Sequence, residues 1–275
     1  MRLLAAVALL AAALACEREV TPVASRGSPA VDAQLAADLD LVRQARVLFA
    51  HGSVGANVLA GVARIPSSGL RVVSLDANAP AALAEGTLAH VPFGPDGDPV
   101  AEIAAFEKRL DSGLQPAPDV ASMQLGCAGV NGDTDTKVLF THYREAIGRL
   151  RRAHPQTAFV HVTCPLTVRD TGAADLVKRL TGLSDGAAQA NVRRDEYNGR
   201  MRAAFRGEPI FDLAAIEALW PDGRPERFVR GGTNHPSLVP VYSDDGRHLV
   251  GEGQDRAARA LIHTLADALR GRTAR

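Results

Sequence analysis

Aromatic residues are scarce in this sequence, and neither sign of charge is in excess. Phe, Trp and Tyr make up 4% of the 275 residues, and 31 Lys and Arg balance 31 Asp and Glu. The absence of a basic excess disfavours nucleic-acid binding, and few aromatic side chains are available to stack on bases or sugars. The absence of an acidic excess, with 46% apolar residues, disfavours disorder and indicates a globular protein with a sizeable core.

Long apolar runs are also missing, apart from one at the N-terminus. Leu3 to Leu14 contains only Leu, Ala and Val; this run of about 12 residues is too short for a membrane-spanning helix, which takes about 20. The basic Met1-Arg2 before the run and the small residues after it are typical of a secretory signal. Ala13-Leu14-Ala15-Cys16 resembles a bacterial lipobox, in which the cysteine is lipidated. A plain secretory signal is the alternative.

From this segment we expect residues 1–15 to be a lipoprotein signal peptide and residues 16–32 a flexible tether after a lipidated Cys16. The tether is rich in Pro, Gly and Ser, and residues 33–275 form the folded domain. Acyl chains such as palmitate contribute about 0.8 kcal/mol per buried methylene, so several chains anchor a protein lastingly. The expected location is the bacterial cell envelope, and Glu17, in place of the Asp that retains lipoproteins in the inner membrane, favours the outer membrane of a two-membrane source.

Only two further cysteines occur, Cys127 and Cys164. Both lie at the ends of expected strands, and export makes a disulfide between them chemically possible. Two buried free thiols are the other interpretation.

Several familiar ligand motifs are absent. The sequence has no Walker A loop, no G-x-G-x-x-G dinucleotide motif in place and no G-x-S-x-G nucleophile elbow. No nucleotide and no other cofactor is therefore implied.

Apolar runs alternate with amphipathic segments from residue 33 onward. Strands are expected at 46–50, 70–75, 119–125, 157–166 and 209–213. Helices are expected at 33–45, 57–65, 99–110, 137–153, 186–205 and 252–269. This alternation is typical of a parallel sheet covered by helices on both faces. We therefore expect a single α/β domain with three α/β/α layers and a central, mostly parallel, five-stranded sheet.

In such a fold the ligand site lies at the carboxyl ends of the strands. Ser53 follows the first strand in the segment "HGSVG", where a helix N-terminus is available to an anion. Late in the chain, Asp245 and His248 are three residues apart and can reach one point from a single turn. These residue types suit a nucleophile, a carboxylate that orients the base, and a base, respectively.

The pattern resembles the SGNH (GDSL-like) hydrolase superfamily over most of residues 45–270. His51-Gly52-Ser53-Val54 stands in place of the usual Gly-Asp-Ser-Leu, and the late Asp-x-x-His matches Asp245 and His248. The first block also resembles that of an uncharacterised bacterial branch with F-x-H-x-S-V-G. Gly94 takes the place of the second-block glycine and Asn131 that of the third-block asparagine, although the third block departs from Gly-x-Asn-Asp.

The resemblance implies a flavodoxin-like SGNH fold and a serine esterase. Ser53 would be the nucleophile, His248 the base and Asp245 its orienting partner. The oxyanion hole would consist of the Ser53 N–H, the Gly94 N–H and the Asn131 side chain. Since surface members of the superfamily often deacetylate polysaccharides, the expected partner is a small-molecule or carbohydrate ester. Contact with the membrane is expected through the N-terminal lipid.

Each site residue also has a structural interpretation. Ser53 could cap the following helix, and His248 could be an ordinary surface histidine. Asp244 could take the role of Asp245. The "NGD" segment that begins at Asn131 is a turn signal, and Gly94 lies in a Gly- and Pro-rich loop. His51 could line the site or simply end its strand.

The same region of the sequence also contains residues that suit other functions. His235, Asp244 and His248 are possible metal ligands, but their spacing matches no metal motif. Cys127 could be a nucleophile only with His161 or His248 as its partner. The rival from another class is a non-catalytic, lipid-anchored envelope protein that binds a glycan or a protein.

Overall fold

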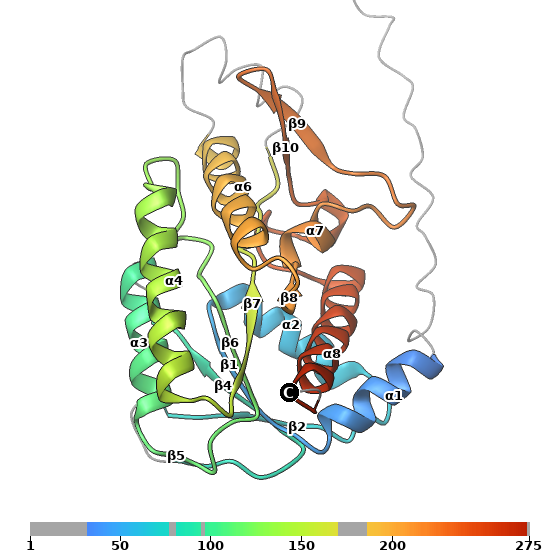
Figure 1. The fold of residues 1–275 in the computed structure, drawn as a ribbon. Helices are drawn as coiled ribbons and strands as arrows, with labels where there is room; N and C mark the ends of the chain where they lie inside the picture. Colours follow the sequence, from blue (N-terminus) through green and yellow to red (C-terminus); the bar gives the residue numbers. More distant parts are fainter. Residues whose placement is uncertain (1–31, 77–80, 95–96, 170–185, 274–275) are drawn as a thin grey trace, which may run out of the picture. The chain divides into compact units, whose positions relative to one another are not determined.

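A parallel sheet forms the centre of the computed structural model, which describes residues 32–76, 81–94, 97–169 and 186–273 (Figure 1). Six strands run in the order β2-β4-β1-β6-β7-β8, and every neighbouring pair is parallel. Two pairs of short strands, β3–β5 and the antiparallel hairpin β9–β10, lie outside this sheet.

The main strands and their helices alternate along the chain. The strands are β1 Arg46–His51, β2 Arg71–Ser74, β3 Ala81–Ala82, β4 Thr87–Pro92, β5 Leu114–Gln115, β6 Val120–Gln124, β7 Ala158–Val162, β8 Ile210–Phe211, β9 Arg227–Arg230 and β10 Thr233–Pro236. The helices are α1 Ala33–Val42, α2 Ser53–Arg64, α3 Pro99–Asp111, α4 Thr136–Ala153, α6 Gly186–Ala204, α7 Leu213–Glu217 and α8 Gly251–Thr273, with a 3-10 turn η1 at Pro240–Tyr242.

This architecture confirms the predicted α/β class and the three layers, but the sheet has six strands rather than five. The strand that the sequence analysis missed is β4, which lies between β2 and β1. Its segment Thr87–Pro92 carries His90 in the middle and ends in proline, so it lacks the continuous apolar run of a buried strand. Its pairing with β1 on one side and β2 on the other compensates for that weak local preference.

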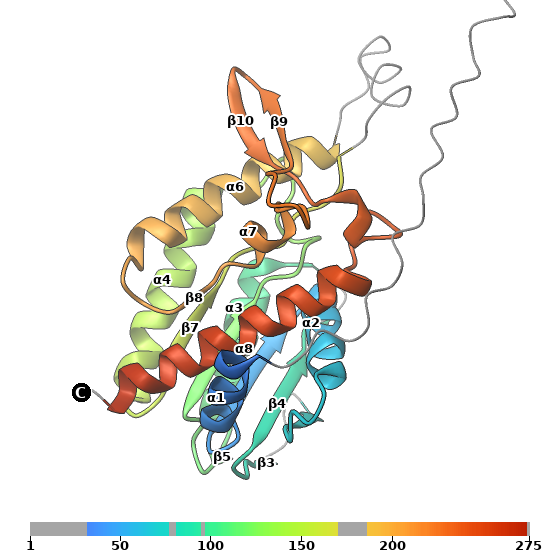
Figure 2. The ribbon, with the colours of Figure 1, turned by 90° about the vertical axis from the view of Figure 1, so that its right-hand side faces the viewer.

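The sheet separates two hydrophobic cores. Val47 and Phe49 of β1 point into the core under α1, α2 and α8, whereas Leu48 and Ala50 point into the core under α3 and α4. Figure 1 shows α3 and α4 on one side of the sheet and α8 on the other, and Figure 2 shows α8 running across α1 and α2. Burial of both faces explains why β1 reads as an apolar run.

The connections after β1 and β6 diverge to opposite faces of the sheet. β1 leads into α2 in the first core, and its neighbour β6 leads, through residues 125–135, towards α4 in the second core. Such a divergence opens a crevice at the carboxyl ends of the two strands, which is where α/β proteins bind ligands. Ser53 begins α2 at this position.

The expected signal peptide, the lipidated Cys16 and the tether up to residue 31 lie outside the described residues. Among the residues that the structure does describe, no helix has both the length and the apolar character needed to cross a bilayer.

The central position of β4 can be tested with Leu88→Ala. Leu88 is fully buried in the core shared with α1, α2 and α8, so the substitution should lower the free energy of unfolding by about 2–5 kcal/mol. Val229→Ala is the control, because Val229 is 68% exposed. Chemical denaturation measures both variants, and equal, small effects would contradict the assignment of β4 to the core of the sheet.

Candidate active site

Ser53 stands at the first turn of α2 but does not cap it. Gly52 is the N-cap residue and has no side chain to cap the helix, and the Gln124 Oε1 accepts the Gly55 N–H of the first turn at 3.0 Å. The Ser53 Oγ instead lies 2.9 Å from the Nε2 of His248. The capping interpretation of the hydroxyl is therefore wrong.

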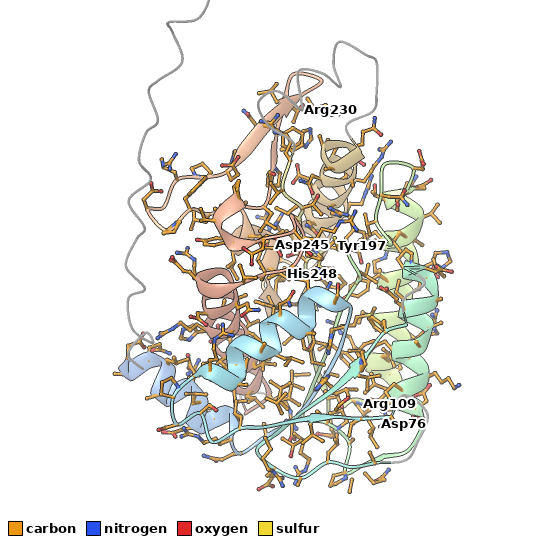
Figure 3. All side chains as sticks on the ribbon, turned by 180° about the vertical axis from the view of Figure 1, so that it is seen from behind. Asp76, Arg109, Tyr197, Arg230, Asp245 and His248 are labelled. Atoms are coloured by element: carbon orange, nitrogen blue, oxygen red, sulfur yellow. The ribbon has the colours of Figure 1, made fainter. Side chains whose placement is uncertain are left out.

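Asp245 and His248 form a single hydrogen-bonded turn beside Ser53. The Asp245 Oδ2 lies 2.5 Å from the His248 Nδ1, and the Oδ1 accepts the backbone N–H groups of His248 and Arg247 at 2.8 and 2.9 Å. The Ser243 hydroxyl donates to the same oxygen at 3.1 Å. Figure 3 shows the labelled pair together beside α2. Asp245, not its neighbour Asp244, contacts the imidazole.

These contacts favour the ionised form of Asp245. The backbone N–H and the side chain of His248, with the backbone N–H of Arg247, hold the pKa of Asp245 well below its usual range. An ionised carboxylate accepts a hydrogen bond from Nδ1–H, and Nε2 is then the ring atom that can accept a hydrogen bond from the Ser53 hydroxyl. The distances and the order of the three side chains are those that a serine nucleophile, a histidine base and an orienting carboxylate require.

Asn57 attaches the histidine segment to the helix that carries the serine. Its Oδ1 accepts the backbone N–H of Leu249 at 3.1 Å, and Leu249 is buried. Asn57 is four residues after Ser53, so both side chains lie on one face of α2. The sequence analysis missed this contact; the i,i+4 spacing from Ser53 was its only local signal.

Glycines let three loops approach closely around the nucleophile. A Cβ on Gly52 would lie 2.7 Å from the Gly126 Cα, and one on Gly129 would lie 2.6 Å from the Gly97 carbonyl oxygen. The backbones that follow β1, β4 and β6 are therefore in direct contact. No side chain fits between them, which accounts for the glycine at position 52.

A buried carboxyl and a buried guanidinium hold the loop after β6. Glu102 Oε2 accepts the Gly126 N–H at 2.8 Å, and Arg194 donates to the carbonyl oxygens of Cys127 and Val130 at 2.6 and 3.1 Å. Burial raises the pKa of Glu102 to about 7. Neither residue was singled out from the sequence, because their partners are distant in the chain.

The two predicted oxyanion residues beyond Ser53 lie in the loops after β4 and β6, the strands on either side of β1, but no hydrogen bond joins either residue to Ser53. Gly94 follows β4 and lines a cavity of about 290 Å³, with open space around its α-carbon. Asn131 accepts the Asp133 N–H on its Oδ1 at 3.0 Å, so it does form the turn that "NGD" indicates. Its NH₂ group has no partner among the described residues.

The remaining expectations concern a metal site at His235 and the state of the two cysteines. His235 contacts Asp195 of α6 at 2.9 Å rather than a metal set with His248, and the described ranges contain no group of three metal-ligand side chains. Cys127 and Cys164 are both buried free thiols. His161 contacts the Tyr143 hydroxyl at 2.8 Å.

No family model and no curated protein matches this chain. Solved structures do resemble it. A Streptococcus pneumonia protein described as a platelet activating factor is 12% identical, with a TM-score of 0.49, over 83% of this chain and 89% of that one. A protein assigned to the G-D-S-L lipolytic family, from Desulfitobacterium hafniense, is 8% identical, with a TM-score of 0.45, over 80% and 99%.

The periplasmic domain of a lipopolysaccharide acetyltransferase from Salmonella ser. Paratyphi A is 13% identical, with a TM-score of 0.42, over 81% of this chain and 85% of that one. The resemblance to GDSL-like proteins that the sequence motifs indicated thus recurs among solved structures.

Replacement of Glu102 by Gln should remove a pH dependence of stability. The carboxyl is protonated in the folded state up to a pKa of about 7 and ionises earlier in the unfolded chain. The stability that the protonated carboxyl contributes is therefore fully present at low pH. As pH rises towards 8, the free energy of unfolding falls by up to about 3 kcal/mol because of this group. Glu102→Gln keeps an acceptor for Gly126, so it should unfold at higher denaturant than wild type at pH 8.

Denaturation of both proteins from pH 4 to pH 8 measures the difference between their free energies of unfolding. The difference is used because burial also raises the pKa of Glu217 to about 8, so both proteins share a pH dependence from that residue. Glu145→Gln, at an exposed position of α4, is the matched control. A constant difference between Glu102→Gln and wild type across this range would contradict a protonated Glu102.

Proposed function

We propose that this chain is a serine ester hydrolase of the SGNH (GDSL-like) type. The observation that supports it most strongly is the hydrogen-bonded series from Asp245 through His248 to Ser53, with distances of 2.5 and 2.9 Å. The series joins residues 195 positions apart in the chain. Neither helix capping nor turn formation requires that contact.

In the first step, the Ser53 Oγ attacks the ester carbonyl carbon while its proton moves to the His248 Nε2. Asp245 stabilises the imidazolium that forms and keeps the ring oriented. The C–O bond to the alcohol then breaks, and the proton on Nε2 passes to the leaving alkoxide oxygen. The products of this step are the free alcohol and an acyl group on Ser53.

In the second step, water repeats the sequence in reverse. His248 Nε2 takes a proton from the attacking water, and the acyl–Oγ bond breaks with return of that proton to Ser53. The carboxylic acid leaves, and no cofactor takes part.

The developing oxyanion needs fixed donors. The Ser53 N–H lies at the first turn of a helix, where backbone N–H groups have no intrahelical acceptor. We propose the Gly94 N–H and the Asn131 NH₂ as the other two donors. Loss of one such donor typically lowers turnover by about 100–1,000-fold.

An exposed site favours an ester on a large molecule. Ser53 is exposed, and the side chains of His248 and Asp245 are 42% and 53% exposed. A polymer can reach such a site without threading into a deep pocket. We therefore propose an O-acylated carbohydrate as the first substrate class to examine, at the cell envelope, with the chain held there by lipid on Cys16.

The alternative function is a lipid-anchored envelope protein that binds a glycan or a protein partner without catalysis. The departure of the segment around Asn131 from Gly-x-Asn-Asp favours it. Survival of glycan binding in Ser53→Ala, together with no turnover of any ester by the wild-type protein, would support this alternative.

An active-site serine probe tests the proposed enzyme. A protein lacking residues 1–16 should form a fluorophosphonate adduct that mass spectrometry maps to Ser53, because His248 activates that hydroxyl. His248→Ala should abolish labelling and lower ester turnover by about 10,000-fold or more.

The matched control is His142→Ala, at an exposed position of α4, which should label as the wild type does. If folded wild-type protein stays unlabelled, or if His248→Ala labels equally well, the proposed mechanism fails.

The proposed anchor predicts the fate of Cys16→Ser. The full chain produced in a bacterial host should fractionate with membranes and carry acyl groups on Cys16, whereas Cys16→Ser should carry none and leave the membrane fraction. Cys127→Ser, which changes a buried thiol, should keep its lipid. A mature N-terminus at another residue, with no acyl group, would contradict the anchor.

A further inference from the structure

His51 and His90 form a hydrogen-bonded pair directly behind the nucleophile. The His51 Nε2 lies 3.0 Å from the His90 Nδ1, and the His51 Nδ1 lies 2.7 Å from the carbonyl oxygen of Gly52. His51 is 2% exposed, at the end of β1, and His90 comes from the adjacent strand β4. Nothing in the reaction derived above uses either ring.

The contacts determine the tautomers. The Gly52 oxygen can only accept, so the His51 Nδ1 must carry the proton. Burial lowers the pKa of His51 to about 4, so the ring is neutral near pH 7, and its Nε2 is a bare acceptor. The His90 Nδ1 must then be the donor to it. The pair therefore forms one directed series from His90 through His51 to the Gly52 carbonyl.

That carbonyl belongs to the peptide whose N–H is the proposed Ser53 oxyanion donor. A trans peptide is planar, with its C=O and N–H on opposite edges, so a contact that fixes the oxygen also fixes the direction of the N–H. The Gly55 N–H donates to the same oxygen at 3.1 Å. Among the described residues, no acceptor takes the Ser53 N–H.

Gly55 lets the beginning of α2 pack closely against His51. A Cβ on Gly55 would lie 2.4 Å from the Cβ of His51, so only glycine at position 55 leaves room for the His51 side chain against α2. Gln124 accepts the Gly55 N–H at 3.0 Å from the other side.

We infer that His51, held by His90, is a positioning residue that aims the Ser53 N–H at the oxyanion. This inference rests on the proposed ester hydrolase function. It assigns a role to the residue at which this chain has histidine in place of the first glycine of Gly-Asp-Ser-Leu. The ring touches neither the substrate nor the reacting atoms.

Kinetics of four variants test the role. His51→Leu removes the donor to Gly52 and should lower kcat by about 10–100-fold with KM nearly unchanged, because the oxyanion develops only in the transition state. His51→Asn places an amide NH₂ near the position of Nδ1, so it should recover most of that loss. His90→Leu should give a smaller decrease in kcat, and His142→Leu, at an exposed position of α4, none.

Two results would overturn the inference. One is wild-type kcat in folded His51→Leu. The other is an equal loss in His51→Asn and His51→Leu, which would indicate a packing role. Circular dichroism and thermal unfolding establish that each variant is folded.

A second measurement does not depend on activity. Long-range ¹H–¹⁵N spectra of the wild-type protein at neutral pH should show His51 and His90 with the proton on Nδ1. A proton on the His51 Nε2 would overturn the inference even if the enzyme is active. Absence of fluorophosphonate labelling in the wild type, by contrast, would refute the proposed function and the positioning role with it.

Discussion

The hydrogen bond between Ser53 and His248 depends on the contact of two segments, distant in sequence, at the carboxyl ends of the strands. Ser53 lies near the start of the folded region, and His248 lies just before the last helix. Packing of α2 against α8 brings them together, and Gly61 makes that packing close, since a Cβ there would lie 2.5 Å from the Gln254 carbonyl oxygen. The Asn57 contact with Leu249 then fixes the position of the histidine turn over the beginning of α2.

The rest of the site also lies at the carboxyl ends of the strands. Glycines at positions 52, 97, 126 and 129 bring the loops after β1, β4 and β6 into backbone contact. Glu102 and Arg194, one from each of two helices on the far face, hold the β6 loop from behind. Ser53 is exposed above these loops, and the buried side chains of Glu102 and Arg194 hydrogen-bond to the backbone beneath it.

The local features of the chain predicted much of this arrangement. The buried strand ending before "HGSVG", the spacing of Asp245 and His248, and the alternation of strands and helices are all visible within short windows. Long-range features were not. β4 is recognisable only once β1 and β2 pair with it, and the partners of Glu102 and Asn57 lie 24 and 192 residues away. Gly94 and Asn131 were placed by resemblance alone, and no contact with Ser53 adds to that.

The departure from Gly-Asp-Ser-Leu has a physical explanation in this chain. Gly52 is required by the approach of Gly126, and Gly55 by the approach of the His51 Cβ. A histidine pair thus occupies the space behind the nucleophile, where it holds the carbonyl of Gly52. The altered motif is therefore compatible with an activated serine.

The central claim is that Ser53 forms a covalent acyl intermediate with the help of His248. Rapid mixing of the protein with an activated ester such as a nitrophenyl acetate, followed by acid quenching and peptide mass spectrometry, tests it most directly. We expect a burst of nitrophenol of about one equivalent per protein and an acetyl group on the peptide that contains Ser53. An acetyl group on another residue, or a burst of equal size in His248→Ala, would contradict it.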